Sequence, residues 1–380
     1  MKRWLWRLTV AAALLAVGVI AFLLLAPSGR AAVKAALFIP EVVPSIPLHP
    51  QEWVTRKPIR ERVSFPLPHG EGVGDLYRPA GGGRHAAVLL FLGVAPAGPE
   101  DPRVVGLGEA LARSGMVAMI YWSPAMLERR IDPEDIANLA HAFQYLRGRD
   151  YVDPARVGMG GFCVGGSFAL MAASLPQVRE DVAFVNAFGP YFRMRDLLRA
   201  LASGTRFRDG STSIWVVDPL AREVFEVQLI ESLEERVEAQ LMWKAFREDR
   251  DPGRLDPGSL SEQGRAVYAL LTGVPFEQVD SYVEQLPDSF LGKMEALSPG
   301  NYVDGLRAEV LIMHDAQDSL VPSDESHRLA QALSGRVEVR FTEFSLFKHM
   351  DPTRRVGFFT LVNETWKLFR HMQRIMLQAT

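Results

Sequence analysis

The order of apolar segments constrains the fold of this chain more than any other feature of its sequence. After residue 60, short runs of strand type alternate with segments of helical periodicity. Residues 86–92 form a continuous apolar run, as in a strand buried on both faces, and residues 133–146 place their apolar side chains at helical spacing. Repeated β–α alternation is typical of a mainly parallel sheet covered by helices, so we expect an α/β fold.

The same pattern predicts individual elements. Two short segments before the first buried strand predict an edge hairpin. We expect strands over residues 62–67, 74–77, 86–92, 116–121, 156–160, 182–188, 310–313 and 337–344. We expect helices over residues 104–113, 133–146, 166–173 and 356–376.

The chain divides into four parts by composition. Residues 61–191 and 305–380 carry the strand–helix alternation and form the predicted core, whereas residues 192–304 are charged and mostly helical, with one candidate strand over 213–217. We interpret 192–304 as an inserted helical lid; the alternative is a connection that serves only packing. Prolines recur in residues 28–60, at positions 40, 44, 47, 50 and 58, which predicts an extended linker.

The N-terminus resembles a membrane segment. Residues 8–26 contain no charge, follow Lys2, Arg3 and Arg7, and would span roughly 28 Å as a helix, close to a bilayer core of about 30 Å. We expect residues 1–27 to be an uncleaved transmembrane anchor, with the rest of the chain outside the cytoplasm by the positive-inside rule. The competing interpretation is a cleaved signal peptide, whose apolar region is normally about 7–15 residues long, and a secreted protein.

Composition narrows the classes of function. The formal net charge is −3 and there is no long basic run, which argues against nucleic acid as a partner. The single cysteine excludes an internal disulfide and argues against a cysteine-based zinc site. We expect no cofactor and no metal, and the oligomeric state stays open.

That cysteine, Cys163, lies in the glycine-rich run 158–166 between a predicted strand and a predicted helix. A nucleophile at such a sharp turn needs small neighbours, and Gly161 and Gly165 stand two residues on either side. The following helix would direct its N-terminal N–H groups toward negative charge and favour a thiolate. The alternatives are an inert buried cysteine and a dinucleotide-binding loop; for the latter, the third glycine would fall at position 163.

A nucleophile of this kind needs a base and an acid that orients the base. Asp318 stands in a polar loop after the buried strand 310–313, with Asp315 as the competitor nearer the strand end. His349 follows the last predicted strand, where the base is expected. We expect His314, His327 and His371 to serve packing or the surface. The predicted oxyanion hole combines the backbone N–H of Val164 with that of Val94, in the loop after 86–92.

These residues resemble the α/β-hydrolase superfamily and, within it, the dienelactone hydrolase-like group. The resemblance covers about 60–191 and 305–380 and rests on Gly-Asp-Leu-Tyr-Arg-Pro at 74–79, Asp-Pro-Ala-Arg-Val-Gly at 153–158, Gly-Phe-Cys-Val-Gly-Gly at 161–166, and Asp318 followed by Val-Pro. Most relatives carry serine at the turn, and cysteine indicates the dienelactone hydrolase side. The N-terminal segment and the insertion depart from that compact, soluble group, as do His-Asp at 314–315 and Leu-Gly at 92–93, where the group often has His-Gly.

The resemblance implies an esterase or lactonase that acts on a small-molecule ester or lactone through a Cys163–His349–Asp318 triad and a thioester. One alternative is an acyltransferase or a peptidase on the same scaffold. Another is an inactive, membrane-anchored binding protein, because a thiolate outside the cytoplasm is liable to oxidation.

Overall fold

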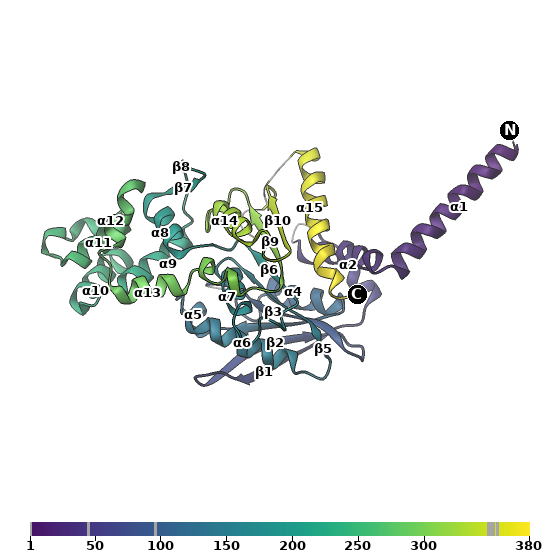
Figure 1. Cartoon of the computed structure of the whole chain (residues 1–380), viewed down its shortest axis with the longest axis horizontal. Helices are drawn as coiled ribbons and strands as arrows, with labels where there is room; N and C mark the ends of the chain where they lie inside the picture. The colour runs from purple at the N-terminus through teal and green to yellow at the C-terminus, as the bar shows by residue number, and fades with distance from the viewer. Residues whose placement is uncertain (1, 44–45, 95–96, 348–353, 355–356) are drawn as a thin grey trace.

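The computed structural model describes residues 2–43, 46–94, 97–347, 354 and 357–380 (Figure 1). Its centre is an eight-stranded sheet in the order β1-β2-β4-β3-β5-β6-β9-β10. The strands are β1 Ile59–Pro66, β2 Glu71–Arg78, β3 His85–Phe91, β4 Met116–Trp122, β5 Val152–Phe162, β6 Phe184–Phe188, β9 Glu309–Asp315 and β10 Val339–Phe344. The strands β1 and β2 form the predicted edge hairpin, β2 runs antiparallel to β4, and all other pairs are parallel.

Helices cover both faces of the sheet, as the alternation predicts. One face carries α6, α7 and α14, and the other carries α2, α4 and α15. Their bounds are α2 Pro27–Val42, α4 Pro102–Arg113, α6 Glu134–Arg147, α7 Val164–Ala173, α14 Ser323–Leu333 and α15 Phe358–Leu377.

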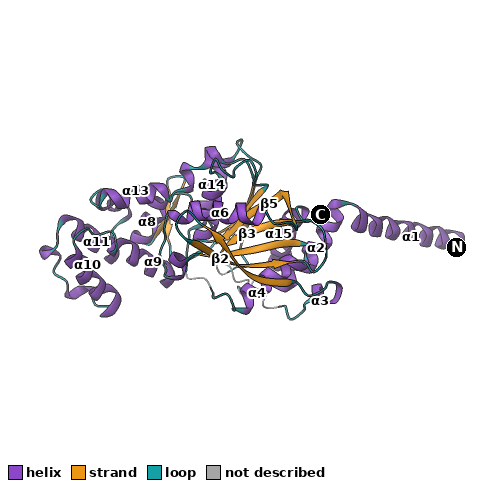
Figure 2. Cartoon of the chain, turned by 90° about the horizontal axis from the view of Figure 1, so that it is seen from below, coloured by secondary structure: helices purple, strands orange, loops and turns teal. Residues whose placement is uncertain are grey.

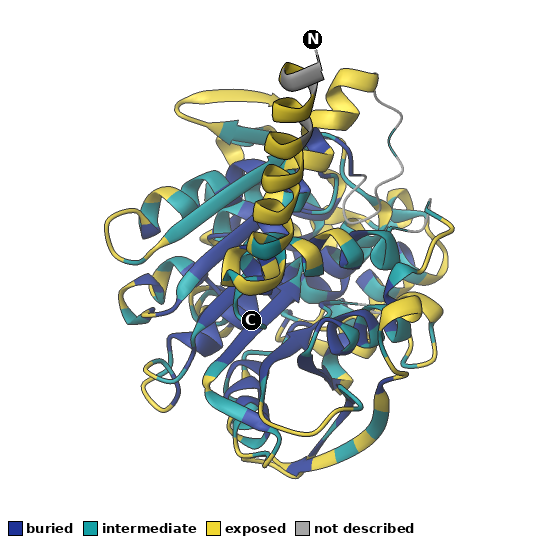
Figure 3. Cartoon of the chain, turned by 90° about the vertical axis from the view of Figure 1, so that its right-hand side faces the viewer, coloured by how far each residue is buried: buried dark blue, intermediate teal, exposed yellow. Residues whose placement is uncertain are grey.

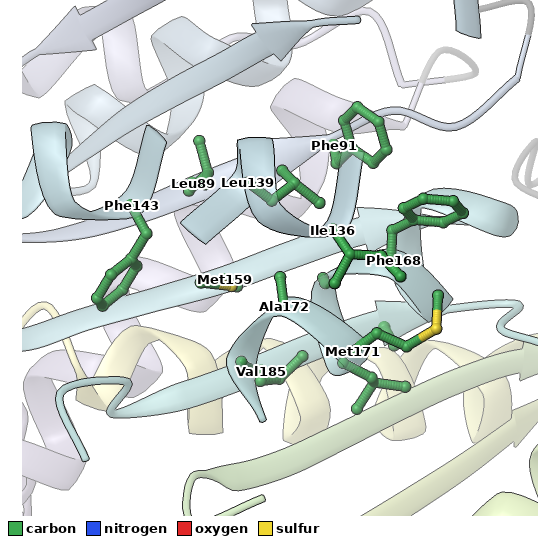
Figure 4. Close-up of a cluster of buried hydrophobic side chains, with 14 of the residues drawn as sticks. Leu89, Phe91, Ile136, Leu139, Phe143, Met159, Phe168, Met171, Ala172 and Val185 are labelled. Carbon is green, nitrogen blue, oxygen red and sulfur yellow. The ribbon is translucent and has the colours of Figure 1, made fainter. Parts of the chain in front are cut away.

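Successive residues of β3 contribute to opposite cores. Ala87, Leu89 and Phe91 pack with α6 and α7, whereas Ala86, Val88 and Leu90 pack toward α4 and α15. This follows from the two-residue period of a strand, and it explains why β3 is apolar throughout. Figure 4 shows the first core, in which Phe143 of α6 and Phe168 of α7 meet the side chains of β3, β5 and β6.

The extended linker predicted over residues 28–60 is wrong in its first part, because Pro27–Val42 is the helix α2. Pro27 stands at the first helical position, where no N–H donor is needed, and Pro40 lies in the last turn. Small side chains at Ala31 and Ala35 are fully buried and let α2 lie close to α15 and α4. Tertiary packing on one apolar face therefore outweighs the cost of the prolines. A short helix, α3 (Pro50–Val54), follows.

The segment 192–304 is mostly helical and has a hydrophobic core of its own. Its helices are α8 Met194–Ser203, α9 Pro219–Ile230, α10 Arg236–Trp243, α11 Glu262–Thr272, α12 Val279–Val283 and α13 Asp288–Ala296. The candidate strand over 213–217 corresponds to β8 (Ser211–Ile214), which pairs with β7 (Thr205–Arg208) in a separate hairpin. These helices lie at the end of the molecule opposite to α1 (Figures 1 and 2).

The helix α1 (Lys2–Leu25) projects from the body of the molecule, and its described side chains are largely exposed (Figure 3). The stretch Trp6–Leu25 is long and apolar enough to cross a membrane, and none of it is buried. The structure therefore contains one N-terminal apolar helix of the kind that serves as a membrane anchor or a signal sequence.

Candidate active site

Cys163 occupies a strained turn between β5 and α7. Its backbone dihedrals are φ 54° and ψ −128°, in a region that costs a non-glycine residue of order 1–3 kcal/mol. The Cys163 N–H donates to the Phe188 carbonyl of β6 at 2.6 Å, which fixes the turn at the end of the sheet. The side chain is half-buried at the N-cap position of α7, where helix N–H groups are unpaired.

Three glycines pack backbone against backbone around this turn. A Cβ on Gly161 would stand 2.3 Å from the Gly165 carbonyl, and a Cβ on Gly165 would stand 2.1 Å from the Phe91 oxygen. Gly93 has φ +85°, and a Cβ there would lie 2.6 Å from the Phe162 oxygen. Such contacts exclude any side chain, so the turn and the loop after β3 can approach each other only through glycine.

The loop after β3 and the start of α7 therefore lie together beside Cys163. Val94 and Val164, the predicted oxyanion donors, line the same cavity as Cys163. Gly93 is a further residue on which this approach depends, and its signal in the sequence is a glycine directly after the apolar run 86–92.

Asp318 is buried in the loop after β9, and its carboxylate accepts two backbone hydrogen bonds. One oxygen, Oδ1, accepts from the N–H groups of Leu320 at 2.7 Å and Val321 at 3.2 Å. The other, Oδ2, lies 3.6 Å from Nε2 of His314. The Trp215 indole donates to the Asp318 backbone carbonyl at 2.7 Å. The loop that holds Asp318 is thus attached to the segment 192–304.

Asp315, the competing acid, is fully buried at the end of β9 and forms a bidentate ion pair. Arg354 donates to its two carboxylate oxygens at 3.1 Å each. Arg354 also donates its backbone N–H to the Leu346 carbonyl at 3.2 Å. Sequence reasoning singled out neither Arg354 nor Trp215, because their partners lie 39 and 103 residues away.

His349, the predicted base, lies outside the described residues. Phe347 is described and precedes it by two positions. Its ring packs edge-on against Phe188, 5.3 Å between centroids, and against Phe344 at 5.1 Å. Phe188 is the residue whose carbonyl accepts the Cys163 N–H. Phe347 therefore lies beside β6, and Arg354 lies at the end of β9.

Three other histidines that follow Cys163 along the chain, His314, His327 and His371, have polar partners in the structure. His314 is fully buried, 2.6 Å from Ser326 Oγ and 3.0 Å from the Val321 carbonyl oxygen. His327 pairs with Glu343 at 3.0 Å on the surface of the core.

His371 is buried in α15 between Thr342 Oγ1 at 2.9 Å and Asn186 Oδ1 at 3.0 Å. Burial lowers the pKa of His371 from 6.5 to about 3, so its ring is neutral near neutral pH.

A cavity of about 690 Å³ opens at Cys163. Its volume lies in the range of ligand pockets, and its walls are almost entirely apolar. Side chains from the segment 192–304 form one part of the wall, among them Leu198, Val224 and Phe290. Among the described residues, no group of three or more His, Cys, Asp or Glu side chains is arranged to hold a metal ion.

Part of the chain matches a known protein family. Residues 109–197, which include the turn and the helix before β5, match the family model of the dienelactone hydrolase family. The protein has an α/β-hydrolase fold, and over these residues it is similar to the dienelactone hydrolase family. Its strand order and mostly parallel sheet agree with the fold that the sequence predicted. No curated protein sequence matches the chain.

Several solved structures are similar to the hydrolase at low identity. One is 2,6-dihydroxy-pseudo-oxynicotine hydrolase, with 15% identity, a TM-score of 0.48, and coverage of 82% of this chain and 68% of that one. An esterase from Pyrobaculum calidifontis has 14% identity and a TM-score of 0.48 over 92% of this chain and 90% of that one. An acylaminoacyl peptidase from Pyrococcus horikoshii has 15% identity and a TM-score of 0.47 over 78% of this chain; the hydrolase spans 39% of its length.

Proposed function

We propose that the hydrolase cleaves an ester or lactone carbonyl with Cys163 as nucleophile, His349 as base and Asp318 as the acid that orients the base. The observation that carries this proposal is the strained turn at Cys163, which holds the residue at the N-terminus of α7 and on the wall of a large cavity. A residue other than glycine adopts such a backbone only when the surrounding structure enforces it, as at a nucleophile.

The choice of acid rests on what each carboxylate already binds. Both oxygens of Asp315 accept from Arg354, so this carboxylate serves an ion pair. The N–H groups of Leu320 and Val321 donate to Oδ1 of Asp318, and they fix that side chain in one orientation. An acid that orients a histidine needs such a fixed carboxylate in a buried site.

The proposal of His349 as the base is supported by the position of Phe347, its neighbour along the chain. His349 follows Phe347 by two positions, and two residues of extended chain span at most about 7 Å. Phe347 lines the cavity that Cys163 lines and packs on Phe188. His371 of α15 is a weaker candidate, because both of its ring nitrogens are engaged, with Thr342 Oγ1 and Asn186 Oδ1.

In the proposed reaction His349 accepts the thiol proton, and the Cys163 sulfur forms a bond to the carbonyl carbon. The resulting oxyanion accepts hydrogen bonds from the N–H groups of Val164 and Val94. The carbon–oxygen bond to the alcohol then breaks, and His349 returns the proton to the leaving oxygen. Water, deprotonated by His349, attacks the thioester carbonyl carbon. The carbon–sulfur bond then breaks, the carboxylic acid leaves, and His349 returns the proton to the Cys163 sulfur.

The remaining parts of the chain receive roles in the same proposal. Residues 192–304 act as a lid over Cys163, which is supported by their contribution to the cavity wall and by the Trp215 bond to the Asp318 loop. Residues 1–27 anchor the hydrolase in a membrane, with the catalytic part outside the cytoplasm, supported by the exposed apolar surface of α1.

The test is intact-mass spectrometry and turnover with p-nitrophenyl acetate, for the native chain and for Cys163→Ala. We expect one acyl group on the native protein and none on the variant, with turnover lowered about 10³-fold or more. Because Cys163 is the single cysteine, alkylation by iodoacetamide provides an independent label of the same atom. Undiminished turnover by folded Cys163→Ala would refute the proposal.

A matched pair of variants tests the acid. Asp318→Asn should lower kcat by about 10³-fold or more, because the asparagine cannot stabilise the protonated base. Asp315→Asn should mainly lower the free energy of unfolding, with a smaller effect on kcat than Asp318→Asn. The reverse pattern would reassign the acid to Asp315.

A further inference from the structure

The cavity at Cys163 continues far beyond the reacting group. It passes over the sheet face that carries α2, α4 and α15, and it is lined there by Val88 and Leu90 of β3 and by Met116 at the start of β4. Met116 pairs with Ala86, six positions before Leu92, which also lines the cavity. At about 3.3 Å per residue, this part of the cavity runs for about 20 Å along the sheet.

The lining of this part excludes most polar ligands. Among the described lining residues, the charged side chains are Glu41 and Arg103, and each is paired, with His49 at 2.9 Å and with Asp101 at 3.0 Å. The remaining walls are mainly aliphatic or aromatic. A polar ligand drawn into such walls would lose its hydration without replacement, whereas a hydrocarbon chain would gain from burial.

We propose that this long part of the cavity binds the hydrocarbon chain of a long-chain acyl ester while the ester carbonyl lies at Cys163. The inference rests on the proposed function, because it assigns the substrate class of that same site. The extent of the apolar walls along β3 and the presence of Cys163 in the same cavity are the two observations that carry it.

A long-chain acyl ester can reach this cavity from two sources: as a lipid in a bilayer, or as a soluble ester. The structure links the cavity to the membrane segment, because Phe38 and Ile39 of its wall belong to α2, which follows α1 with only Ala26 between them. The first turns of α15 add an exposed apolar surface, with Phe358 73% and Phe359 87% exposed. In Figures 1 and 3 these turns and the N-terminal end of α1 lie toward the same side of the molecule.

The first test compares p-nitrophenyl esters of acetate, butyrate, octanoate and palmitate with the full chain. Burial of each methylene favours binding by about fourfold, so kcat/KM should rise at least tenfold from butyrate to palmitate. The esters are supplied in one arm in detergent micelles and in the other in phosphatidylcholine vesicles that also carry the protein. A rise in vesicles alone assigns the bilayer source, and an equal rise in both assigns a soluble ester. A flat or falling series in both arms overturns the inference.

A matched pair of variants on α4 tests the position of the substrate's hydrocarbon chain in the cavity. Leu107 and Val105 are both half-buried, but only Leu107 lines the cavity. Leu107→Trp should lower the ratio of kcat/KM for palmitate to that for acetate about tenfold, whereas Val105→Trp should leave this ratio unchanged. Equal effects of the two variants on the ratio would contradict the inference.

A binding measurement separates this inference from the proposed function. Cys163→Ala should bind cis-parinaric acid with the fluorescence increase of an apolar site, and Leu107→Trp in the same background should weaken binding about tenfold. If the native chain acylates Cys163 with acetate but does not bind the fatty acid, the substrate class is wrong and the proposed function stands. If the fatty acid binds but no ester acylates Cys163, the proposed function is wrong and the apolar site stands.

Discussion

Replacement of Gly165 by alanine tests whether close backbone contact forms the turn at Cys163. The added Cβ would stand 2.1 Å from the Phe91 carbonyl oxygen and 2.7 Å from the Gly93 nitrogen. Non-bonded heavy atoms prefer about 3.5–4.0 Å, so the turn and the loop after β3 must separate by more than about 1 Å. Both contacts are with backbone atoms, which cannot rotate away as a flexible side chain can.

The expected cost follows from that displacement. Overpacking of a well-packed site costs about 1–3 kcal/mol, and we expect about 3 kcal/mol here because two backbone segments have to move. A misplacement of about 1 Å in a catalytic site also costs about 10²-fold in rate, so kcat/KM should fall by that factor if Val94 and Val164 form the oxyanion hole.

Gly292→Ala in α13 is the matched control, because its Cβ would meet no atom within 4 Å. In a helix interior this change should raise stability by about 0.5–1 kcal/mol and leave turnover unchanged. Both variants are unfolded in guanidinium chloride by circular dichroism and assayed with p-nitrophenyl acetate. The reasoning fails if Gly165→Ala stays within about 0.5 kcal/mol of the native chain and keeps its activity.

Two further predictions concern buried polar groups. Arg354→Met leaves the carboxylate of the fully buried Asp315 without its guanidinium and should cost about 3 kcal/mol. Adding Asp315→Asn should recover part of that loss in chemical denaturation, and a fully additive double variant would contradict the pairing. Since burial lowers the pKa of His371 to about 3, only the unfolded chain takes up this proton as pH falls from about 6.5 toward 3. Stability should therefore fall through that window, and His371→Gln should show a shallower fall; equal slopes would refute the assignment.

The sequence predicted the sheet because the signals are local. The strands β3, β4 and β9 are short apolar runs, and each contributes to both cores through the two-residue period. The glycines beside Cys163 are likewise a local signal, since the space at Gly161 and Gly165 is limited by the turn itself. The helix α2 was missed because proline lowers local helix propensity, whereas its stability comes from burial of Ala31 and Ala35 against α15, more than 300 positions later.

By itself, then, the sequence determined the α/β fold, the strained turn at Cys163 and the candidates Asp318 and His349, because periodicity, glycine spacing and chain order are properties of neighbouring residues. Only the tertiary structure decided that Asp315 is bound by Arg354, that Trp215 holds the Asp318 loop, and that α2, α4 and α15 line an apolar cavity that Cys163 also lines. Those features depend on contacts between segments far apart in the chain, whose energies arise only when packing brings both sides together.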